Sequence, residues 1–223
     1  TTFSPKEEII MKIGFIGCGN RATAMLKGIL KSGEVEASDM IASAKSDKTR
    51  EKIEKELGIR KADTNAQVVD FADVVFLAVK PQFLEGVLDE IRDSVKAGQI
   101  FISIAPGKTL QWLGERLGEN TKVIRTMPNT PAMVGEGMTA LCVNELVTEE
   151  EIALAVKLCD TFGKTEVIPE HLMDAVVGVS GSSPAYVFMF LEAMADAAVA
   201  DGMPRAQAYK FAAQSVLGSA KLM

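Results

Sequence analysis

The segment over residues 11–30 constrains the fold more than any other part of the chain. An apolar run over residues 11–17 has the length of a buried parallel strand, and it leads through a glycine turn into helical spacing. In this turn Gly17 permits a tight bend, Gly19 lets the backbone approach a pyrophosphate, and Ala22 keeps the helix close to the strand. Amide groups and the dipole at the helix N-terminus favour an anion there. The segment therefore predicts a dinucleotide site, the alternative being a tight turn in another α/β fold.

Strand-like and helical segments alternate along the first three quarters of the chain. The expected strands cover residues 11–17, 40–43, 72–79, 99–104, 123–125, 137–143 and 165–168, and the expected helices cover residues 22–30, 49–57, 82–94, 110–117 and 149–162. This alternation predicts an α/β fold with a Rossmann-type, doubly wound parallel sheet that is covered on both faces. The last strands would extend the sheet at one edge.

After Pro169 the chain becomes rich in alanine and methionine. Residues 184–200 are apolar nearly all the way round, so this helix must be buried on several sides. Too few residues follow to enclose it, and we expect either a partner subunit or a truncated chain. The expected domains are an N-terminal extension (1–10), a dinucleotide-binding domain (11–169) and an apparently incomplete, all-helical dimerisation and substrate domain (170–223).

Composition excludes several classes of function. The net charge of −6 leaves no basic field that would attract nucleic acid. No apolar run reaches the ~20 residues that span a bilayer, and the N-terminus lacks a secretory pattern. We therefore expect a cytoplasmic protein without nucleic-acid or membrane partners. Cys18, Cys142 and Cys159 show no metal-type or redox-type spacing, so no metal is expected.

The end of the second strand indicates which dinucleotide is bound. An acid about 20 residues after the glycine turn selects NAD through the ribose hydroxyls. Here Ser43 and Lys45 occupy that region, and the first acid is Asp47. A hydroxyl and an ammonium group suit a 2′-phosphate, so NADP(H) is preferred and NAD(H) remains possible; an ordinary polar loop is the alternative reading.

Further candidate residues follow later strands. Residues 78–81 end the fourth strand at the edge where open α/β sheets bind ligands, and Lys80 there is either a cofactor contact or a solvated lysine. Residues 125–131 form a two-proline loop that lies beside the nicotinamide or is a stiff connection. Ser183 is the expected N-cap and Pro184 the first residue of a helix, which leaves Ser180 and Ser182 to bind a small carboxylate.

The chain offers no strong acid for reducing a ketone. His171 is the one histidine, and its place after a proline and a glutamate does not indicate catalysis. Hydride transfer to a ketone needs a proton for the developing alkoxide, usually from His or Lys. An imine nitrogen is basic enough to be protonated near neutral pH, so the sequence favours reduction of a C=N bond.

Four ordered motifs resemble the pyrroline-5-carboxylate reductase family. They are Gly-Phe-Ile-Gly-x-Gly-Asn at 14–20, Ala-Val-Lys-Pro at 78–81, Met-Pro-Asn-Thr-Pro at 127–131 and Ser-Gly-Ser-x-Pro-Ala-Tyr at 180–186. The resemblance runs from residue 11 to residue 223. It implies an NADPH-binding Rossmann domain, a helical domain that intertwines with a second subunit, and reduction of 1-pyrroline-5-carboxylate to L-proline. It also implies a homodimer or a larger homo-oligomer built on dimers.

The resemblance assigns roles by position. The cofactor would be held by Gly17, Gly19, Asn20, Ala22, Ser43, Lys45, Asn65, Ala78, Val79, Lys80, Pro81, Ala105 and Asn129. The substrate would lie against Asn129, Glu170, Ser180, Gly181 and Ser182, with Ser180 and Ser182 as the catalytic candidates.

The chain departs from the family pattern at several positions. Arg21 replaces a usual Met, Val177 an often-found Thr and Ser183 a usual Gly, and the family continues into a substrate-binding segment after the point where this chain ends. Two alternatives stay open. A β-hydroxyacid dehydrogenase-like enzyme would need a lysine on the helix over residues 184–200, which has none. A regulatory module would bind NADPH without turnover.

Overall fold

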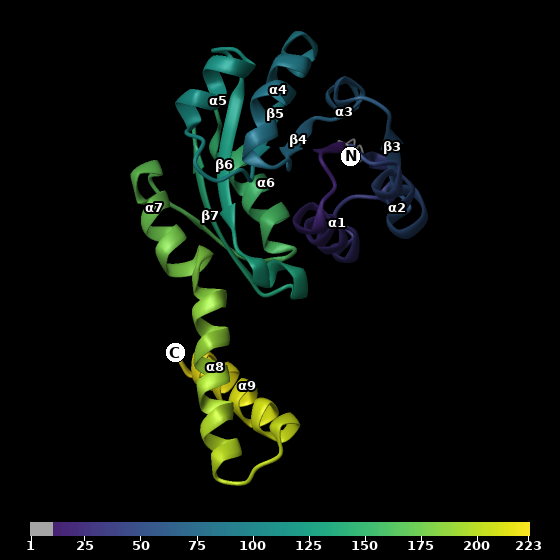
Figure 1. Cartoon of the computed structure of the whole chain (residues 1–223). Coiled ribbons are helices and arrows are strands. Elements are labelled where there is room, and N and C mark those ends of the chain that lie inside the picture. The colour runs from purple at the N-terminus through teal and green to yellow at the C-terminus, as the bar shows by residue number, and fades with distance from the viewer. Residues whose placement is uncertain (1–10) are drawn as a thin grey trace, which may run out of the picture. The chain divides into compact units, whose positions relative to one another are not determined.

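The computed structural model describes residues 11–223, so the extension predicted over residues 1–10 lies outside the described residues. The chain divides into two compact units, the first ending at Val176 and the second covering Val177–Met223. Figure 1 shows the sheet and its helices in the first unit and the two long helices, α8 and α9, in the second.

The first unit is built on one eight-stranded sheet. Its strands are β1 (Ile13–Ile16), β2 (Met40–Ser43), β3 (Arg60–Ala62), β4 (Val74–Leu77), β5 (Ile100–Ser103), β6 (Lys122–Pro128), β7 (Gly137–Val143) and β8 (Gly163–Val167). The strand order is β3-β2-β1-β4-β5-β6-β7-β8. All neighbours are parallel except β6 and β7, which pair antiparallel. The parallel strands β1, β2, β4 and β5 therefore end at the same edge of the sheet.

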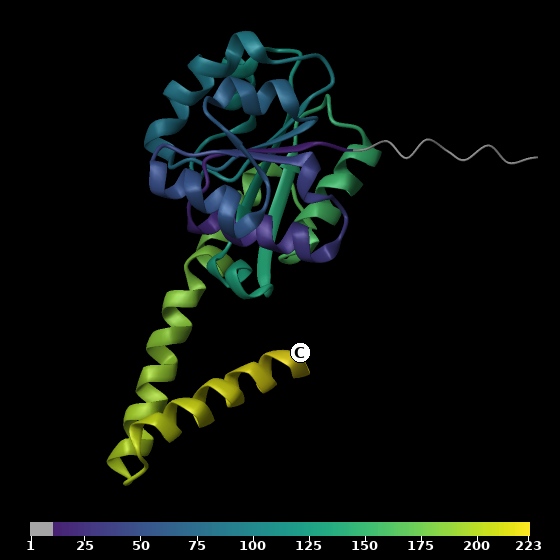
Figure 2. The same cartoon turned by 90° about the vertical axis from the view of Figure 1, so that its right-hand side faces the viewer.

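Helices cover both faces of this sheet (Figure 2). The α-helices are α1 (Asn20–Ser32), α2 (Asp47–Leu57), α3 (Asn65–Phe71), α4 (Pro81–Ile91), α5 (Leu110–Leu117), α6 (Glu149–Asp160), α7 (Met173–Val176), α8 (Ser183–Ala200) and α9 (Arg205–Leu222). Short helical turns are η1 (Ala37–Asp39), η2 (Arg92–Ser94), η3 (Thr130–Val134), η4 (Glu170–Leu172) and the π-helical η5 (Val177–Gly181).

Two apolar cores hold the layers together. Side chains of α1, α2 and α6 form one core with one face of the sheet, where Phe15 and Phe76 stack with ring centroids 4.4 Å apart. Side chains of α3, α4 and α5 form the other core on the opposite face. All four residues of β1 are buried, which explains why this strand is an uninterrupted apolar run.

The predicted doubly wound α/β fold is confirmed, and several bounds match. β2, β7 and α5 have the predicted limits. The prediction gave no element over residues 58–71, where the structure has β3 and α3. β3 is an edge strand with two of its three residues exposed, so it carries no apolar signal.

The two-proline loop expected over residues 125–131 begins later than predicted. β6 continues to Pro128 because its end pairs with Thr139 of the antiparallel strand β7. A proline is tolerated at the end of a strand, where a missing amide donor removes little of the ladder. Only the part of this segment after Pro128 leaves the sheet.

The start of α8 also differs from the expectation. Ser182 is the N-cap, Ser183 is the first helical residue and Pro184 the second. The Ser183 hydroxyl donates to the Ser180 carbonyl (3.3 Å) and caps no amide. The π-helical turn before α8 supplies this carbonyl, so the chain enters the helix from an existing turn.

The helices of the second unit expose much apolar surface. Ala195 is the only residue of α8 that is buried, whereas Tyr186, Phe188, Met189 and Phe190 are exposed. Among the described residues one helical stretch of 31 residues, Glu170–Ala200, is long and apolar enough to cross a membrane by length and composition alone, which the sequence analysis did not expect. A helix that a partner subunit covers has the same composition.

Candidate functional site

Gly17 brings the ends of three strands together. Its φ of 94° lies in the region that favours glycine, and a Cβ there would lie 2.9 Å from the Ala78 carbonyl oxygen. The Gly17 amide donates to the Ser43 carbonyl (3.2 Å), and the Ala78 amide donates to the Ile16 carbonyl (2.9 Å). The fold itself therefore requires glycine at this position, where β1, β2 and β4 end.

Gly19 differs from Gly17, because neither its backbone angles nor any of the described residues around it requires glycine. It is the N-cap of α1 with φ −76° and ψ −175°, an ordinary extended conformation. A Cβ at this position would meet no atom within 4 Å. No side chain caps α1, and no acid lies in its first turn. The turn thus offers open space beside helix amides, which fits the pyrophosphate of a dinucleotide.

A cavity of about 420 Å³ opens beside this turn. The sequence-predicted residues that line it are Gly17, Ser43, Lys45, Asn65 and Val79. They come from four separate segments, which the parallel strands bring to one edge of the sheet. This is the edge where ligands of open α/β sheets bind.

A chain of hydrogen bonds joins three residues that line the cavity. The Ser43 hydroxyl donates to Asn65 Oδ1 (2.7 Å), and Asn65 Nδ2 donates to Glu90 Oε2 (2.7 Å). Two cations also line the cavity. Lys45 Nζ lies 5.2 Å from the centre of the Phe83 ring, and Arg50 Nε donates to the Ala44 carbonyl (2.7 Å). The site can therefore bind a sugar through its polar groups and an anion through its cations.

Sequence reasoning missed Phe83 and Glu90, which line this cavity together with Arg50, a member of a local Lys/Arg cluster that the sequence left open as a phosphate contact. The two missed residues are far from the glycine turn in the sequence, and neither belongs to a motif that indicates a cofactor contact. Phe83 and Glu90 lie seven residues apart on α4, which is about two helical turns, so a helical wheel of α4 could have placed them on one face.

The other predicted cofactor residues are at the same sheet edge but do not line this cavity. Asn20 is the first residue of α1, and Ala22 is buried beneath it. Lys80 is the N-cap of α4 and Pro81 its first residue, both directly after β4. Ala105 is buried just after β5. Their roles toward the cofactor stay predictions.

Asn129 has a structural function in the first unit. Its backbone amide donates to the Met138 carbonyl (3.2 Å), and its Oδ1 accepts from the Met138 amide (2.8 Å). These bonds fasten the end of β6 to β7. The predicted contacts of Asn129 with nicotinamide and substrate remain a prediction.

Glu170 is held by two groups of the first unit. Its Oε1 accepts from Arg125 (2.9 Å) and from the Leu110 amide at the start of α5 (2.8 Å). The ion pair is mostly buried, with Arg125 10% and Glu170 33% exposed. Nearby, burial raises the pKa of the Cys142 thiol to about 12, and the Glu170 carboxylate adds to the shift. Glu170 thus links η4 to β6 and α5, a function that its predicted substrate role did not include.

Ser180, Gly181 and Ser182 belong to the second unit. Ser180 and Gly181 form the end of the π-helical η5, and the Ser182 amide donates to the Val177 carbonyl (2.9 Å). Val177 begins this turn and Ser183 follows it closely, so two of the departures from the family pattern lie there. The carboxylate-binding role of this turn stays a prediction.

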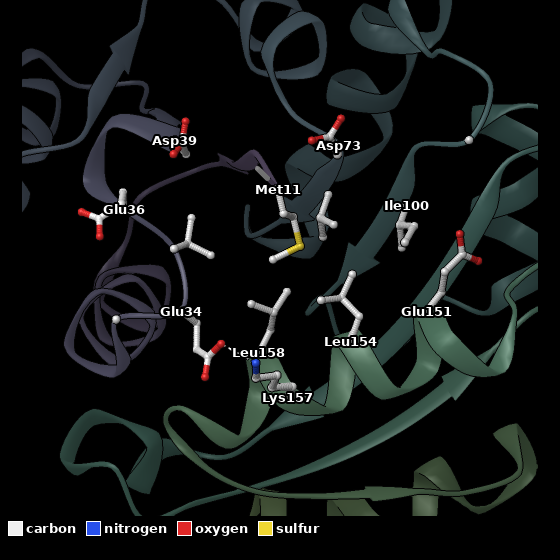
Figure 3. Close-up of a pocket in the computed structure, with 14 residues that line it drawn as sticks. Met11, Glu34, Glu36, Asp39, Asp73, Ile100, Glu151, Leu154, Lys157 and Leu158 are labelled. Carbon is white, nitrogen blue, oxygen red and sulfur yellow. Dashed lines mark ion pairs between the residues drawn. The ribbon is translucent and has the colours of Figure 1, made fainter. Parts of the chain in front are cut away.

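A second cavity, of about 730 Å³, is larger but lies at the other end of the strands. Figure 3 shows Leu154 and Leu158 of α6 beside Met11, with Glu34 paired to Lys157. Val74 and Ile100, which also line it, begin their strands. Size alone favours this cavity, but ligands of open α/β sheets bind at the carboxyl ends of the strands, so the smaller cavity is the better candidate for the cofactor.

Comparison with known proteins decides the family. Residues 12–107 match a family model described as NADP oxidoreductase coenzyme F420-dependent, and residues 170–223 match one described as pyrroline-5-carboxylate reductase dimerisation. The pyrroline-5-carboxylate reductase of Escherichia coli is 50% identical over 95% of this chain and 79% of its own length. The chain belongs to the pyrroline-5-carboxylate reductase family.

Other relatives and solved structures agree with this membership. The pyrroline-5-carboxylate reductase of Methanosarcina acetivorans is 40% identical over 95% of this chain and 78% of its own length. The solved structure of the Coxiella burnetii reductase has a TM-score of 0.91 at 31% identity, covering 96% of this chain and 79% of that one. A Plasmodium falciparum pyrroline carboxylate reductase with NADP bound has a TM-score of 0.84 at 28% identity, covering 95% and 78%.

A hydroxyacid dehydrogenase shares only the fold with this family member. The Mycobacterium tuberculosis 3-hydroxyisobutyrate dehydrogenase has a TM-score of 0.60 at 12% identity, covering 71% of this chain and 54% of that one. Within residues 11–223, the part of the chain that the structure describes, no cluster of three or more His, Cys, Asp or Glu side chains could hold a metal ion.

Proposed function

We propose that this chain reduces 1-pyrroline-5-carboxylate to L-proline with NADPH, the last step of proline biosynthesis. The observation that carries the proposal is Gly19, a glycine that the fold does not need in a turn that a pyrophosphate would fill. Membership of the family gives the substrate, and the E. coli relative, 50% identical, bears the name of this activity.

The residues of the first unit would bind and orient the cofactor. The glycine turn and the amides of α1 would hold the pyrophosphate, and Ser43 and Lys45 would contact the phosphorylated ribose. The bound NADPH supplies the hydride. Lys80 and Ala105 follow β4 and β5 at the same edge, where they would line the rest of the dinucleotide.

The substrate end of the reaction needs little acid catalysis. An imine nitrogen is already basic, so the chain's main task is to orient the imine carbon toward the hydride. Asn129 and Ser180 to Ser182 would provide hydrogen-bond partners for nicotinamide and substrate carboxylate. Glu170 would act by holding its segment in place, because its carboxylate already accepts two hydrogen bonds.

We further propose a cytoplasmic homodimer, or a larger assembly built on dimers. The exposed apolar side chains of α8 and the match of residues 170–223 to a dimerisation domain support a subunit interface there. This interface would bury the surface that makes the stretch Glu170–Ala200 apolar.

The test combines binding with turnover on the purified chain. NADPH binding is measured first by fluorescence titration, and pyrroline-5-carboxylate is then added while NADPH absorbance is followed and proline is identified by mass spectrometry. We expect substrate-dependent oxidation of NADPH with one proline formed per NADPH. Tight NADPH binding without any oxidation would instead support the regulatory module that binds the cofactor without turnover.

A further inference from the structure

Glu90 supplies the acid that the sequence around Ser43 lacks. No carboxylate follows β2 before Asp47, yet the structure brings Glu90 from α4 into the same cavity. Its Oε2 lies 2.7 Å from Asn65 Nδ2, and Asn65 in turn contacts Ser43. An acid beside the adenosine ribose is the feature that favours a free 2′-hydroxyl.

The direction of these hydrogen bonds follows from the carboxylate. An ionised Glu90 only accepts, so Asn65 must turn its NH₂ toward Glu90 and its oxygen toward Ser43. The Ser43 hydroxyl then donates its one hydrogen to Asn65. What Ser43 and Glu90 offer a ligand is lone pairs, which accept from ribose hydroxyls but cannot donate to a phosphate.

The charges around the cavity are balanced. Lys45 and Arg50 contribute the positive charges, and Asp63 and Glu90 the negative ones. Arg50 is further engaged by Asp47 at 3.4 Å. A 2′-phosphate therefore gains two cations but meets two carboxylates, one of which is bonded to Asn65.

We propose that Glu90 is a specificity-determining residue. Through Asn65 it fixes Ser43 as an acceptor for the ribose, it offers its own carboxylate as a second acceptor, and it lowers the preference for a 2′-phosphate, so that the chain binds NADH as well as NADPH. The proposal rests on the proposed function only in needing a dinucleotide in this cavity. The role of Glu90 predicts that the selectivity between NADPH and NADH changes when the charge of this side chain is removed and its shape is kept.

The test is Glu90→Gln, with Asp89→Asn as the matched control. Glutamine keeps the acceptor for Asn65, while Asp89 is the neighbouring exposed carboxylate of α4 and does not line the cavity. Dissociation constants for NADPH and NADH are measured by fluorescence titration without substrate. Since the groups are solvent-exposed, we expect Glu90→Gln to tighten NADPH binding by about 3–5-fold and to change NADH binding by less than about 2-fold. Asp89→Asn should change neither.

Fragments of the dinucleotide show which part of the cofactor Glu90 affects. Binding of 2′,5′-ADP should tighten in Glu90→Gln by the same factor as NADPH, and binding of 5′-AMP should not. Equal changes for NADPH and NADH, or the same change in Asp89→Asn, would overturn the role of Glu90 while leaving the reductase proposal intact. If Glu90→Gln tightens NADPH binding selectively but the unmodified chain forms no proline, the role of Glu90 is supported and the reductase proposal is refuted.

Discussion

Replacing Gly19 with alanine separates the needs of the fold from those of the cofactor. Its φ of −76° is open to any residue, and the new methyl group would meet no atom within 4 Å. Alanine stiffens the unfolded chain, which stabilises the fold by about 0.4–1 kcal/mol, but it is a poorer N-cap than glycine by a similar amount. We therefore expect the free energy of unfolding without cofactor to change by less than about 1 kcal/mol.

The same methyl group should strongly weaken cofactor binding. It would fill the space beside the α1 amides that the pyrophosphate needs, and hydrogen bonds to charged groups contribute about 1.5–3 kcal/mol each. Loss of one such bond corresponds to a roughly 10–150-fold higher dissociation constant for NADPH. Urea unfolding without cofactor measures the stability, and fluorescence titration with NADPH measures the affinity.

Two other glycines provide controls. Gly17→Ala should lower stability by about 1–2 kcal/mol or more, because φ is 94° and the Cβ would press on Ala78. Gly114→Ala lies in the middle of α5 with no atom near the new methyl, so it should stabilise the fold and leave NADPH binding unchanged. Unchanged NADPH affinity in Gly19→Ala would refute the assignment of the pyrophosphate to this turn.

Three further changes test other parts of the structure. Arg21 is exposed in the first turn of α1, where its charge should favour binding of the pyrophosphate. Arg21→Met should therefore weaken NADPH binding about 2–5-fold at low salt and less at high salt. Equal weakening in the control Lys27→Met would contradict this role of Arg21. Burial raises the pKa of Cys159 from 9.0 to about 12. The thiol therefore contributes stability below pH 9 that is lost as pH rises toward 12, by up to about 1.4 kcal/mol per pH unit, and urea unfolding of Cys159→Ala should show a shallower alkaline decline. Glu170→Gln removes the charge that compensates the buried Arg125 and should lower the free energy of unfolding by roughly 1–3 kcal/mol; no loss in urea unfolding would mean that the ion pair is not important for stability.

Strong local patterns made most of the fold predictable. β1 and β2 are short and fully buried, so their apolar runs marked them in the sequence, and α5 has a Thr109 cap directly before its first residue. β3 was missed because an exposed edge strand needs no apolar alternation. Its structure depends on pairing with β2, which no local pattern records.

The sequence alone determined the glycine turn, the alternation of strands and helices, and the motifs that define the family. These features are local: a backbone angle, a helix start or a buried run imposes its residue type within a few positions. The tertiary structure decided which side chains share the cofactor cavity. Ser43, Asn65 and Glu90 lie on three different elements, and only the order of the strands brings their hydrogen bonds together. In the sequence, the absence of an acid directly after β2 indicated a preference for NADP(H). In the structure, the packing of α4 against the sheet places the carboxylate of Glu90 in the same cavity.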